Sequence, residues 1–334
     1  MPLRSARAVV PSRSARAVLP SPDRRRDLRK AVLAWFADHG RELDFRVGRQ
    51  RDPWGILVSE VMAQQTQIGR VEERWPAFMD AFPTPAVMAT ASPADVIRAW
   101  RGLGYNRRAL NLHRAAVTIA AAGGTVPGDV DGLMALPGIG PYTARAVAAI
   151  AFGIPVGAVD VNVRRVLGRI LAADVAAMAP ASLQAAADAL VDPDQPGAWT
   201  HALMDIGATV CRPARPSCAS CPARPWCRAA RELGDGEAAR RAAADPTATR
   251  PAATRPAAIR PAAVPFEQTT RWLRGRLVDR LRDAAPGAVL AVDGPLGVHP
   301  PEAVARALAG LARDGMVELD AAGRARLAGS TELA

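Results

Sequence analysis

A turn rich in glycine and proline, placed between two expected helices, could hold a phosphate group. The turn is Leu136-Pro137-Gly138-Ile139-Gly140, and an alanine-rich helix follows it directly. Amide groups in the first turn of a helix have no internal partner and lie at the positive end of the helix dipole, so they can donate to an anion. Gly138 and Gly140 would allow left-handed dihedrals and a close approach by another backbone. The same turn also suits an ordinary corner between helices.

Four cysteines form a second candidate site. Cys211, Cys218, Cys221 and Cys227 are separated by six, two and five residues. Thiolates on a compact loop are soft ligands that select zinc or an iron–sulfur cluster. Zinc ribbons usually pair two C-x-x-C knuckles and this loop has one, so the spacing favours a [4Fe–4S] cluster. Because the cysteines are clustered, they indicate a metal site in a reducing compartment more readily than disulfides.

Arginines on the cysteine loop could face DNA. Arg212 and Arg215 lie between the first two cysteines, and Arg224 lies before the last. A loop held rigidly by a cluster would keep these guanidinium groups at a fixed height against phosphates. A redox role is the alternative use of the cluster, but the sequence shows no flavin or nicotinamide site nearby.

The charge of the whole chain favours a polyanionic partner. The 334 residues carry a formal net charge of +11, and the basic residues are arginines apart from Lys30. Part of this charge lies in a tail and a linker that would be basic in any case. No apolar run reaches the roughly 20 residues that span a bilayer, and the N-terminus lacks a signal-peptide hydrophobic region. We expect a cytoplasmic, nucleoid-associated monomer.

The elements that must position these residues are expected to be mainly helical. Helical periodicity marks residues 23–39, 54–66, 71–82, 93–103, 107–122, 131–136, 162–172, 183–191 and 199–210, besides the helix after the turn. Residues 41–55 are expected to form a loop, and 156–160 read as strand-like. Residues 1–22 are expected to be a disordered basic arm, and 229–264 an Ala/Arg/Pro linker. In 265–334, two helices and a terminal hairpin give the outline of a winged helix.

Four motifs in order carry a family resemblance. They are SEVMAQQTQ at 59–67, GLGYNRRALNLHRAA at 102–116, LPGIGPYTA at 136–144 and VDVNVRRV at 159–166, ahead of the cysteines. With them the chain resembles the helix-hairpin-helix DNA glycosylases of the endonuclease III class, and among these the MutY-type adenine glycosylases. The resemblance implies a six-helix barrel with the hairpin at 54–157 and a helical iron–sulfur domain at 23–53 and 158–228. It also implies excision of adenine mispaired with 8-oxoguanine or guanine in double-stranded DNA.

The resemblance gives roles to two carboxylates. Cleavage of a purine N-glycosidic bond needs an acid for the leaving base and a carboxylate for the cationic sugar. By similarity Glu60 protonates adenine at N7, and Asp160 stabilises the oxocarbenium ion or briefly traps it. Without the motifs, Glu60 would read as an exposed helix glutamate and Asp160 as a helix N-cap. Tyr142 would line the pocket, and Asn162 would orient water or Asp160.

Residues that contact DNA are implied in the same way. A target base must leave the stack, and the gap must be filled. The family's wedging glutamine and tyrosine match Gln65 and Tyr105, and an arginine near the adenine matches Arg46. Bifunctional relatives use a lysine in the LPGxGxKTA context as an amine nucleophile. Tyr142 stands there, so we expect a monofunctional glycosylase that leaves an abasic site.

The sequence departs from the family pattern at three places. LDFR at 43–46 replaces the usual LPWR, and His201 stands where Gln or Glu is usual. Residues 265–334 are too short and too helical for the family's Nudix-like domain. Two alternatives stay open: a pyrimidine-lesion glycosylase like endonuclease III, and a non-catalytic iron–sulfur sensor that binds DNA.

Overall fold

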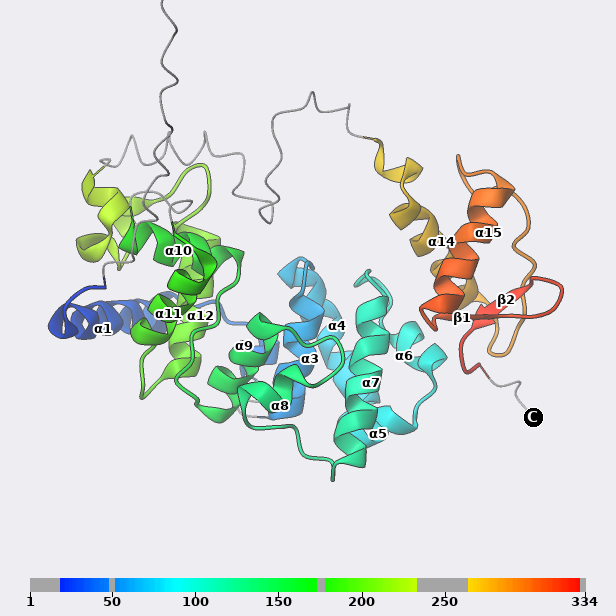
Figure 1. Ribbon diagram of the computed structural model, residues 1–334, viewed down its shortest axis with the longest axis horizontal. Helices are drawn as coiled ribbons and strands as arrows, with labels where there is room; N and C mark the ends of the chain where they lie inside the picture. Colours follow the sequence, from blue (N-terminus) through cyan, green and yellow to red (C-terminus); the bar gives the residue numbers. More distant parts are fainter. Residues whose placement is uncertain (1–18, 48–51, 173–177, 233–263, 331–334) are drawn as a thin grey trace, which may run out of the picture. The chain divides into compact units, whose positions relative to one another are not determined.

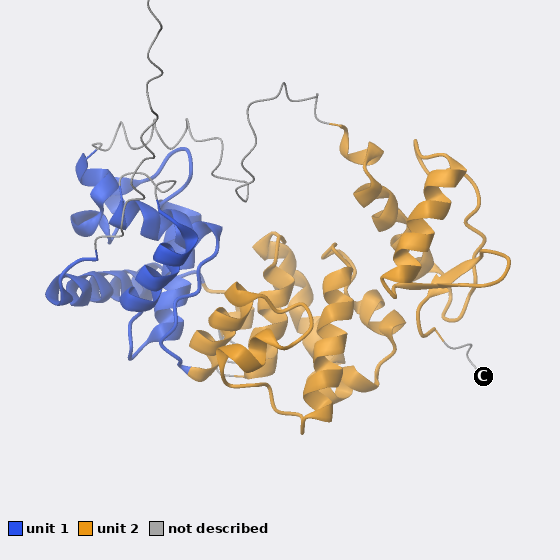
Figure 2. Ribbon diagram, viewed as in Figure 1, with its two compact units in different colours: residues 1–41, 153–252 blue, residues 42–152, 253–334 orange. Residues whose placement is uncertain are grey.

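The computed structural model describes residues 19–47, 52–172, 178–232 and 264–330. These residues fall into two compact units (Figure 2). Unit 1 takes residues 1–41 and 153–252, and unit 2 takes 42–152 and 253–334. Most of the predicted basic arm and linker lies outside the described residues. The division into a cluster domain, a barrel and a C-terminal domain stays a prediction.

The regular secondary structure in the described residues of unit 1 is helical. Its helices are α1 (Pro22–His39), α10 (Val161–Leu171), α11 (Pro180–Leu190) and α12 (Pro196–Asp205), extended by a π-helical turn η2 (Ile206–Val210) and the short 3-10 turns η3 (Cys218–Ser220) and η4 (Arg224–Trp226) (Figure 1). Leu28 and Val32 of α1 share one core with Trp199 of α12. The cysteine loop packs on the same core through Ala223 and the partly buried Trp226.

In its described residues, unit 2 begins with eight helices. They are α2 (Asp44–Val47), α3 (Pro53–Ala63), α4 (Ile68–Ala81), α5 (Pro85–Thr90), α6 (Pro93–Ala99), α7 (Arg107–Ala121), α8 (Val130–Met134) and α9 (Pro141–Phe152). The starts of α3, α5 and α6 share one device, in which a capping side chain is followed by proline. Asp52, Thr84 and Ser92 each accept a backbone hydrogen bond from the first turn of their helix. A proline at the first helical position costs no hydrogen bond, because the N–H that it lacks would have no partner within the helix. The capping residue and the proline therefore both favour a helix start at these positions.

The C-terminal domain, residues 264–330, closes unit 2. It contains η5 (Phe266–Gln268), α14 (Thr270–Asp283), α15 (Pro301–Arg313) and an antiparallel pair, β1 (Val317–Leu319) and β2 (Ala325–Leu327), in which Glu318 faces Arg326. Leu277, Leu308 and Leu327 from these elements are buried together with Ile97 of α6 and Leu110 of α7. The predicted order of two helices and a terminal hairpin is confirmed.

Three sequence expectations about secondary structure are wrong. Residues 41–55 contain α2 and the start of α3 rather than a continuous loop, and α5 was not expected. Residues 156–160 form no strand, because the segment has no strand partner. The mainly helical fold class itself is confirmed. None of the helices in the described residues is long and apolar enough to span a membrane.

Candidate DNA-processing site

The α3 helix carries the first candidate catalytic group inside a buried environment. Residues Trp54–Met62 are all buried, and Glu60 is only 8% exposed. Two tryptophan hydrogen bonds hold the start of the helix. Trp54 Nε1 donates to the Phe82 carbonyl at 3.0 Å, and Trp75 Nε1 donates to the Gly55 carbonyl at 3.3 Å. Burial excludes the interpretation of Glu60 as an exposed helix glutamate.

A tyrosine on α9 contacts the Glu60 carboxyl group. The Tyr142 hydroxyl donates to Oε2 of Glu60 at 3.2 Å, although the two residues are 82 positions apart. Helices α3 and α9 pack against each other. One residue further along α9, Thr143 Oγ1 accepts from Gln64 Nε2 at 3.0 Å. These two hydrogen bonds fix the orientation of the acid and of the end of α3.

Arg108 on α7 donates hydrogen bonds to both the end of α3 and the loop before α7. It donates to the carbonyl oxygens of Val61, Met62 and Gln64 at 2.9, 2.9 and 2.5 Å. Those three bonds come from Nη1, and Nη2 of the same guanidinium group donates to the carbonyls of Leu103 and Gly104 at 3.0 and 3.1 Å. Burial lowers the pKa of Arg108 to about 10, so the guanidinium stays protonated at neutral pH. One arginine therefore supplies partners for carbonyls at the C-terminal end of α3 and in the loop before α7 that would otherwise lack them.

The two segments joined by Arg108 display the residues that the resemblance assigns to DNA insertion. Gln65 and Tyr105 have φ values of 54° and 45°, and they alone among the described non-glycine residues have positive φ. This left-handed conformation is uncommon for residues other than glycine and clusters at functional sites. Both side chains are exposed. The structure thus presents Gln65 and Tyr105 on strained, anchored turns.

The hairpin between α8 and α9 agrees only partly with the sequence expectation. Gly138 has a φ of 81°, and a Cβ there would lie 2.6 Å from Cβ of Asn111, so glycine is required. Gly140 is different: its φ is not positive and a Cβ would meet nothing within 4 Å. The expected left-handed role of Gly140 is therefore wrong. Arg46, on the short α2, is half-buried.

In unit 1, Asp160 is the N-cap of α10. Its Oδ1 accepts from the Val163 amide at 2.7 Å, and its Oδ2 accepts from Asn162 Nδ2 at 3.1 Å. Burial raises the pKa of Asp160, and these hydrogen bonds oppose the rise because they favour the carboxylate. The prediction that Asp160 caps a helix is confirmed, and capping does not exclude a catalytic role for the same carboxylate.

A hydrogen-bonded chain leads from Asp160 to the cysteine loop. Asn162 Oδ1 accepts from Arg165 at 2.8 Å. The same guanidinium donates to the carbonyls of Gly207 and Cys211, each at 2.7 Å. A Cβ on Gly207 would lie 2.6 Å from Cβ of Asn162, so the π-helical turn η2 approaches α10 as closely as glycine permits. The first cysteine and the candidate carboxylate are therefore positioned by one arginine.

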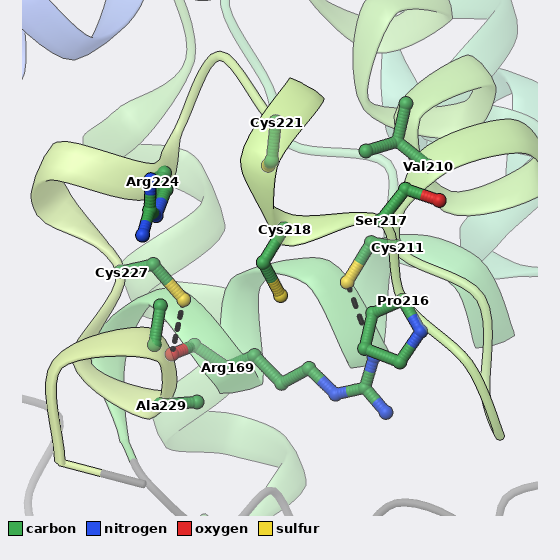
Figure 3. A pocket seen from close by; sticks show the side chains of 11 residues that line it. Arg169, Val210, Cys211, Pro216, Ser217, Cys218, Cys221, Arg224, Cys227 and Ala229 are labelled. Carbon is green, nitrogen blue, oxygen red and sulfur yellow. Dashed lines mark hydrogen bonds between the residues drawn. The ribbon is translucent and has the colours of Figure 1, made fainter. Parts of the chain in front are cut away.

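The four cysteines line a single pocket. Figure 3 shows their side chains projecting toward a common space, with Arg169 and Arg224 beside them. Arg169 donates to Cys211 Sγ at 3.3 Å and to the Arg212 and Pro213 carbonyls at 3.0 and 2.9 Å. Its guanidinium thus fixes both the sulfur and the start of the loop.

The donor set of this pocket suits a thiolate-bound group. Burial raises the pKa of Cys221 to about 12 and also raises the pKa of Cys227. Thiols in such a site ionise when a bound cation compensates for the lost hydration. The four thiols that line this pocket supply the soft ligand set that zinc and iron–sulfur clusters take.

The arginines of the cysteine loop that could face DNA, Arg212, Arg215 and Arg224, are all exposed. Arg212 and Arg215 are exposed, and Arg212 makes a long 3.5 Å contact to Ser217 Oγ. Both guanidinium groups can therefore reach an anion in solvent.

His201 of α12, which stands where the family usually has Gln or Glu, stacks on Phe36 with 6.3 Å between the ring centroids. This departure from the family pattern therefore has a packing partner.

Sequence reasoning missed three arginines that organise the site: Arg108, Arg165 and Arg169. Each donates to two or more main-chain carbonyls far along the chain. No local spacing distinguishes these arginines, since the neighbours of Arg165 three and four positions away include Asn162, Gly168 and Arg169. Arg165 itself is 8% exposed.

Comparisons with known proteins agree on one family. Residues 58–190 match the family described as "HhH-GPD superfamily base excision DNA repair protein". A protein from Mycolicibacterium smegmatis named adenine DNA glycosylase is 41% identical over 305 residues, which are 90% of this chain and 96% of the relative.

Two solved structures are similar to the chain. A thermostable thymine-DNA glycosylase has 26% identity and a TM-score of 0.59, covering 63% of this chain and 98% of that one. A trapped covalent intermediate of endonuclease III with DNA has 25% identity and a TM-score of 0.54, covering 64% of this chain and 99% of that one.

Proposed function

Since the chain belongs to the adenine DNA glycosylases of the HhH-GPD superfamily, we propose that its substrate is adenine mispaired with 8-oxoguanine or guanine in double-stranded DNA. Hydrolysis of the N-glycosidic bond releases adenine and leaves an abasic site. The observation that carries this proposal is the buried Glu60 held by the Tyr142 hydroxyl. An acid fixed in an apolar surrounding is what a poor leaving group such as a purine base needs.

The two carboxylates have different roles in the proposed reaction. Glu60 protonates N7 of adenine, which turns the base into a better leaving group. Asp160 keeps its carboxylate through hydrogen bonds from Val163 and Asn162, and it stabilises the positive charge that develops on the sugar. Water then adds at the sugar carbon, with Asn162 orienting either the water or Asp160.

Tyr142 limits the reaction to hydrolysis. Strand cutting by a Schiff-base mechanism needs an amine nucleophile at the site. The single lysine of the chain, Lys30, lies on α1. Tyr142 occupies the position after the hairpin and donates to Glu60 instead. We therefore infer a monofunctional enzyme.

The cysteine pocket is proposed to hold a [4Fe–4S] cluster bound by Cys211, Cys218, Cys221 and Cys227. When bound, the cluster would supply four metal–thiolate links that make the loop rigid. Arg169 then holds the start of the loop from α10. Arg212 and Arg215 face solvent from this loop and contact DNA phosphates. Iron and acid-labile sulfide bound to the purified chain, with a broad visible absorption, are the expected results. A colourless protein containing stoichiometric zinc would contradict them.

The remaining DNA contacts come from unit 2. Gln65 and Tyr105 insert into the stack on the strand opposite the adenine, and the hairpin amides near Gly138 and Gly140 bind a phosphate. Arg46 contributes near the adenine. Because duplex DNA is the substrate, we propose that the protein acts at the chromosome. We also propose that it acts as a monomer.

Release of free base tests the proposed substrate. Under single-turnover conditions, the wild-type chain should release adenine from duplexes with A opposite 8-oxoguanine and A opposite G, and leave A opposite T intact. A duplex with thymine glycol serves as the comparison for a pyrimidine-directed enzyme. Release of the damaged pyrimidine without release of adenine would refute the proposal.

A further inference from the structure

Two exposed aromatic rings of unit 2 are joined by one arginine. The guanidinium carbon of Arg271, at the start of α14, lies 4.0 Å from the ring centroid of Tyr105 and 5.7 Å from that of Phe266. Tyr105 is 38% exposed and Phe266 is 54% exposed. We call these three residues the Tyr105–Arg271 surface. Neither ring is explained as part of a hydrophobic core.

The position of Arg271 beside Tyr105 is fixed by buried contacts further along α14. Arg282, which is 5% exposed, donates to the Ile97 carbonyl at 3.0 Å and to Asn106 Oδ1 at 3.1 Å. Asn106 is the residue next to Tyr105. The shared core of α14 with α6 and α7 adds an apolar anchor. The approach of the C-terminal domain to Tyr105 is therefore built into the packing of unit 2.

The charge of the surface is available to a ligand. Arg271 is exposed and makes no ion pair with any carboxylate in the described part of the chain. Arg108 lies under the same tyrosine, with its guanidinium carbon 5.5 Å from the ring centroid. An exposed aromatic ring flanked by guanidinium groups is the arrangement on which unpaired nucleobases stack.

We propose that the Tyr105–Arg271 surface binds the nucleobase opposite the excised adenine, with Arg271 and Phe266 extending the stacking platform that Tyr105 begins. The proposal rests on the proposed function, in which Tyr105 enters the stack at that base. In this proposal Arg271 and Phe266 determine specificity for the opposite base. The C-terminal domain, to which the sequence assigned no role, contributes both residues.

Binding measurements on two duplexes test the proposal. In the full-length chain with Glu60→Gln, which blocks excision, affinity is measured for A opposite G and for A opposite a tetrahydrofuran abasic analogue. Arg271→Ala and Phe266→Ala are each expected to weaken binding of the A:G duplex about tenfold, the scale of one lost stacking or cation–π contact. Binding of the abasic duplex should change less than about twofold by the same reasoning, since no base is present to stack.

The matched control is Arg306→Ala, which removes an exposed arginine on α15 of the same domain. It should weaken both duplexes equally or not at all. An equal loss on both duplexes for Arg271→Ala would overturn the proposal and assign Arg271 to a phosphate. An absence of loss would overturn it as well. Adenine release by the wild-type chain is measured on the same A:G duplex, so failure of the proposed function is seen separately.

Discussion

At the scale of single residues, the buried Glu60 is the group whose removal should affect chemistry alone. Glu60→Gln keeps the size of the side chain and an acceptor for the Tyr142 hydroxyl. Because positioned proton transfer contributes about 10²–10⁴-fold in rate, single-turnover adenine release should fall by that factor. DNA affinity should change little, as measured by titration of the same duplex.

The control for Glu60→Gln is Glu73→Gln, which alters a 65% exposed glutamate on α4 that pairs with Arg74. This variant should retain the wild-type rate. Unchanged excision by Glu60→Gln would contradict the assignment of the acid and would favour the non-catalytic DNA-binding alternative.

A second residue-scale prediction concerns pH. Burial raises the pKa of Asp160, and the amide of Asn162 opposes the rise by donating to the carboxylate. Asn162→Ala removes that donor, so the pKa of Asp160 should rise further. The ionised form needed for catalysis is then lost at a higher pH, and the acidic limb of the rate profile should move to higher pH. Single-turnover rates across the acidic range measure the shift.

The neighbouring exposed residue supplies the comparison for this profile. Val161 is 69% exposed, and Val161→Ala leaves every hydrogen bond of Asp160 in place. Its acidic limb should coincide with that of the wild type. A limb that stays fixed or moves to lower pH in Asn162→Ala would show that Asp160 does not control the rate in this range.

Residue types and spacing predicted more of the chemistry than of the contacts that organise it. The motifs indicated Glu60, Asp160, Tyr142 and the cysteines before any geometry was known. The hydrogen bond from Tyr142 to Glu60 spans 82 positions, and no local pattern encodes such a pairing. The roles of Arg108 and Arg165 were missed for a related reason. The chain is rich in arginine, so the sequence alone does not separate an arginine that donates to buried carbonyls from one that faces DNA.

At the scale of elements, the close approach of η2 to α10 controls the carboxylate. Gly207→Ala would place a Cβ 2.6 Å from Cβ of Asn162, so one of the two segments must shift. Overpacking of this kind costs about 1–3 kcal/mol of stability. We expect a lower free energy of unfolding in urea together with slower adenine release, because Asn162 also holds Asp160.

Gly69→Ala is the matched substitution for this test. Gly69 lies in α4, and a Cβ there would meet nothing within 4 Å. Alanine in a helix is favoured over glycine by about 1 kcal/mol, so this variant should be as stable as the wild type or more stable. Equal effects of the two substitutions would mean that the contact between η2 and α10 is not tight in solution.

Helix prediction succeeded where amphipathic periodicity was long and failed where it was short. The expected helix at 107–122 matches α7, Arg107–Ala121, because its apolar positions repeat over four turns. The six residues of α5 are too few for any periodicity. Thr84 followed by Pro85 was the local signal of that helix. The π-helical turn η2 lies close against Asn162, a contact between residues distant in the chain that the sequence does not reveal.

At the scale of the whole molecule, Arg282 joins the C-terminal domain to α6 and α7. It is buried, pairs with Asp279 at 2.7 Å, and donates to Ile97 and Asn106. Arg282→Ala leaves the Ile97 carbonyl and the Asn106 side-chain oxygen without their donor, and a buried acceptor left unsatisfied costs about 1–3 kcal/mol. Urea unfolding and limited proteolysis should show a destabilised chain that is cut readily within residues 264–330.

The exposed Arg280, on the same helix, serves as the control for docking. Arg280→Ala should unfold at the same urea concentration as the wild type and resist protease equally. Identical behaviour of the two variants would contradict the docking role of Arg282.

The most direct test of the central claim is strand cleavage with and without alkali. Duplexes containing A opposite 8-oxoguanine, A opposite G, or thymine glycol are incubated with the wild-type chain, and borohydride is added to parallel samples. The account predicts cleavage of the adenine strands only after alkali, because Tyr142 replaces an amine nucleophile, and no trapped adduct. Cleavage of the thymine glycol strand alone, or efficient borohydride trapping of a covalent adduct, would contradict it.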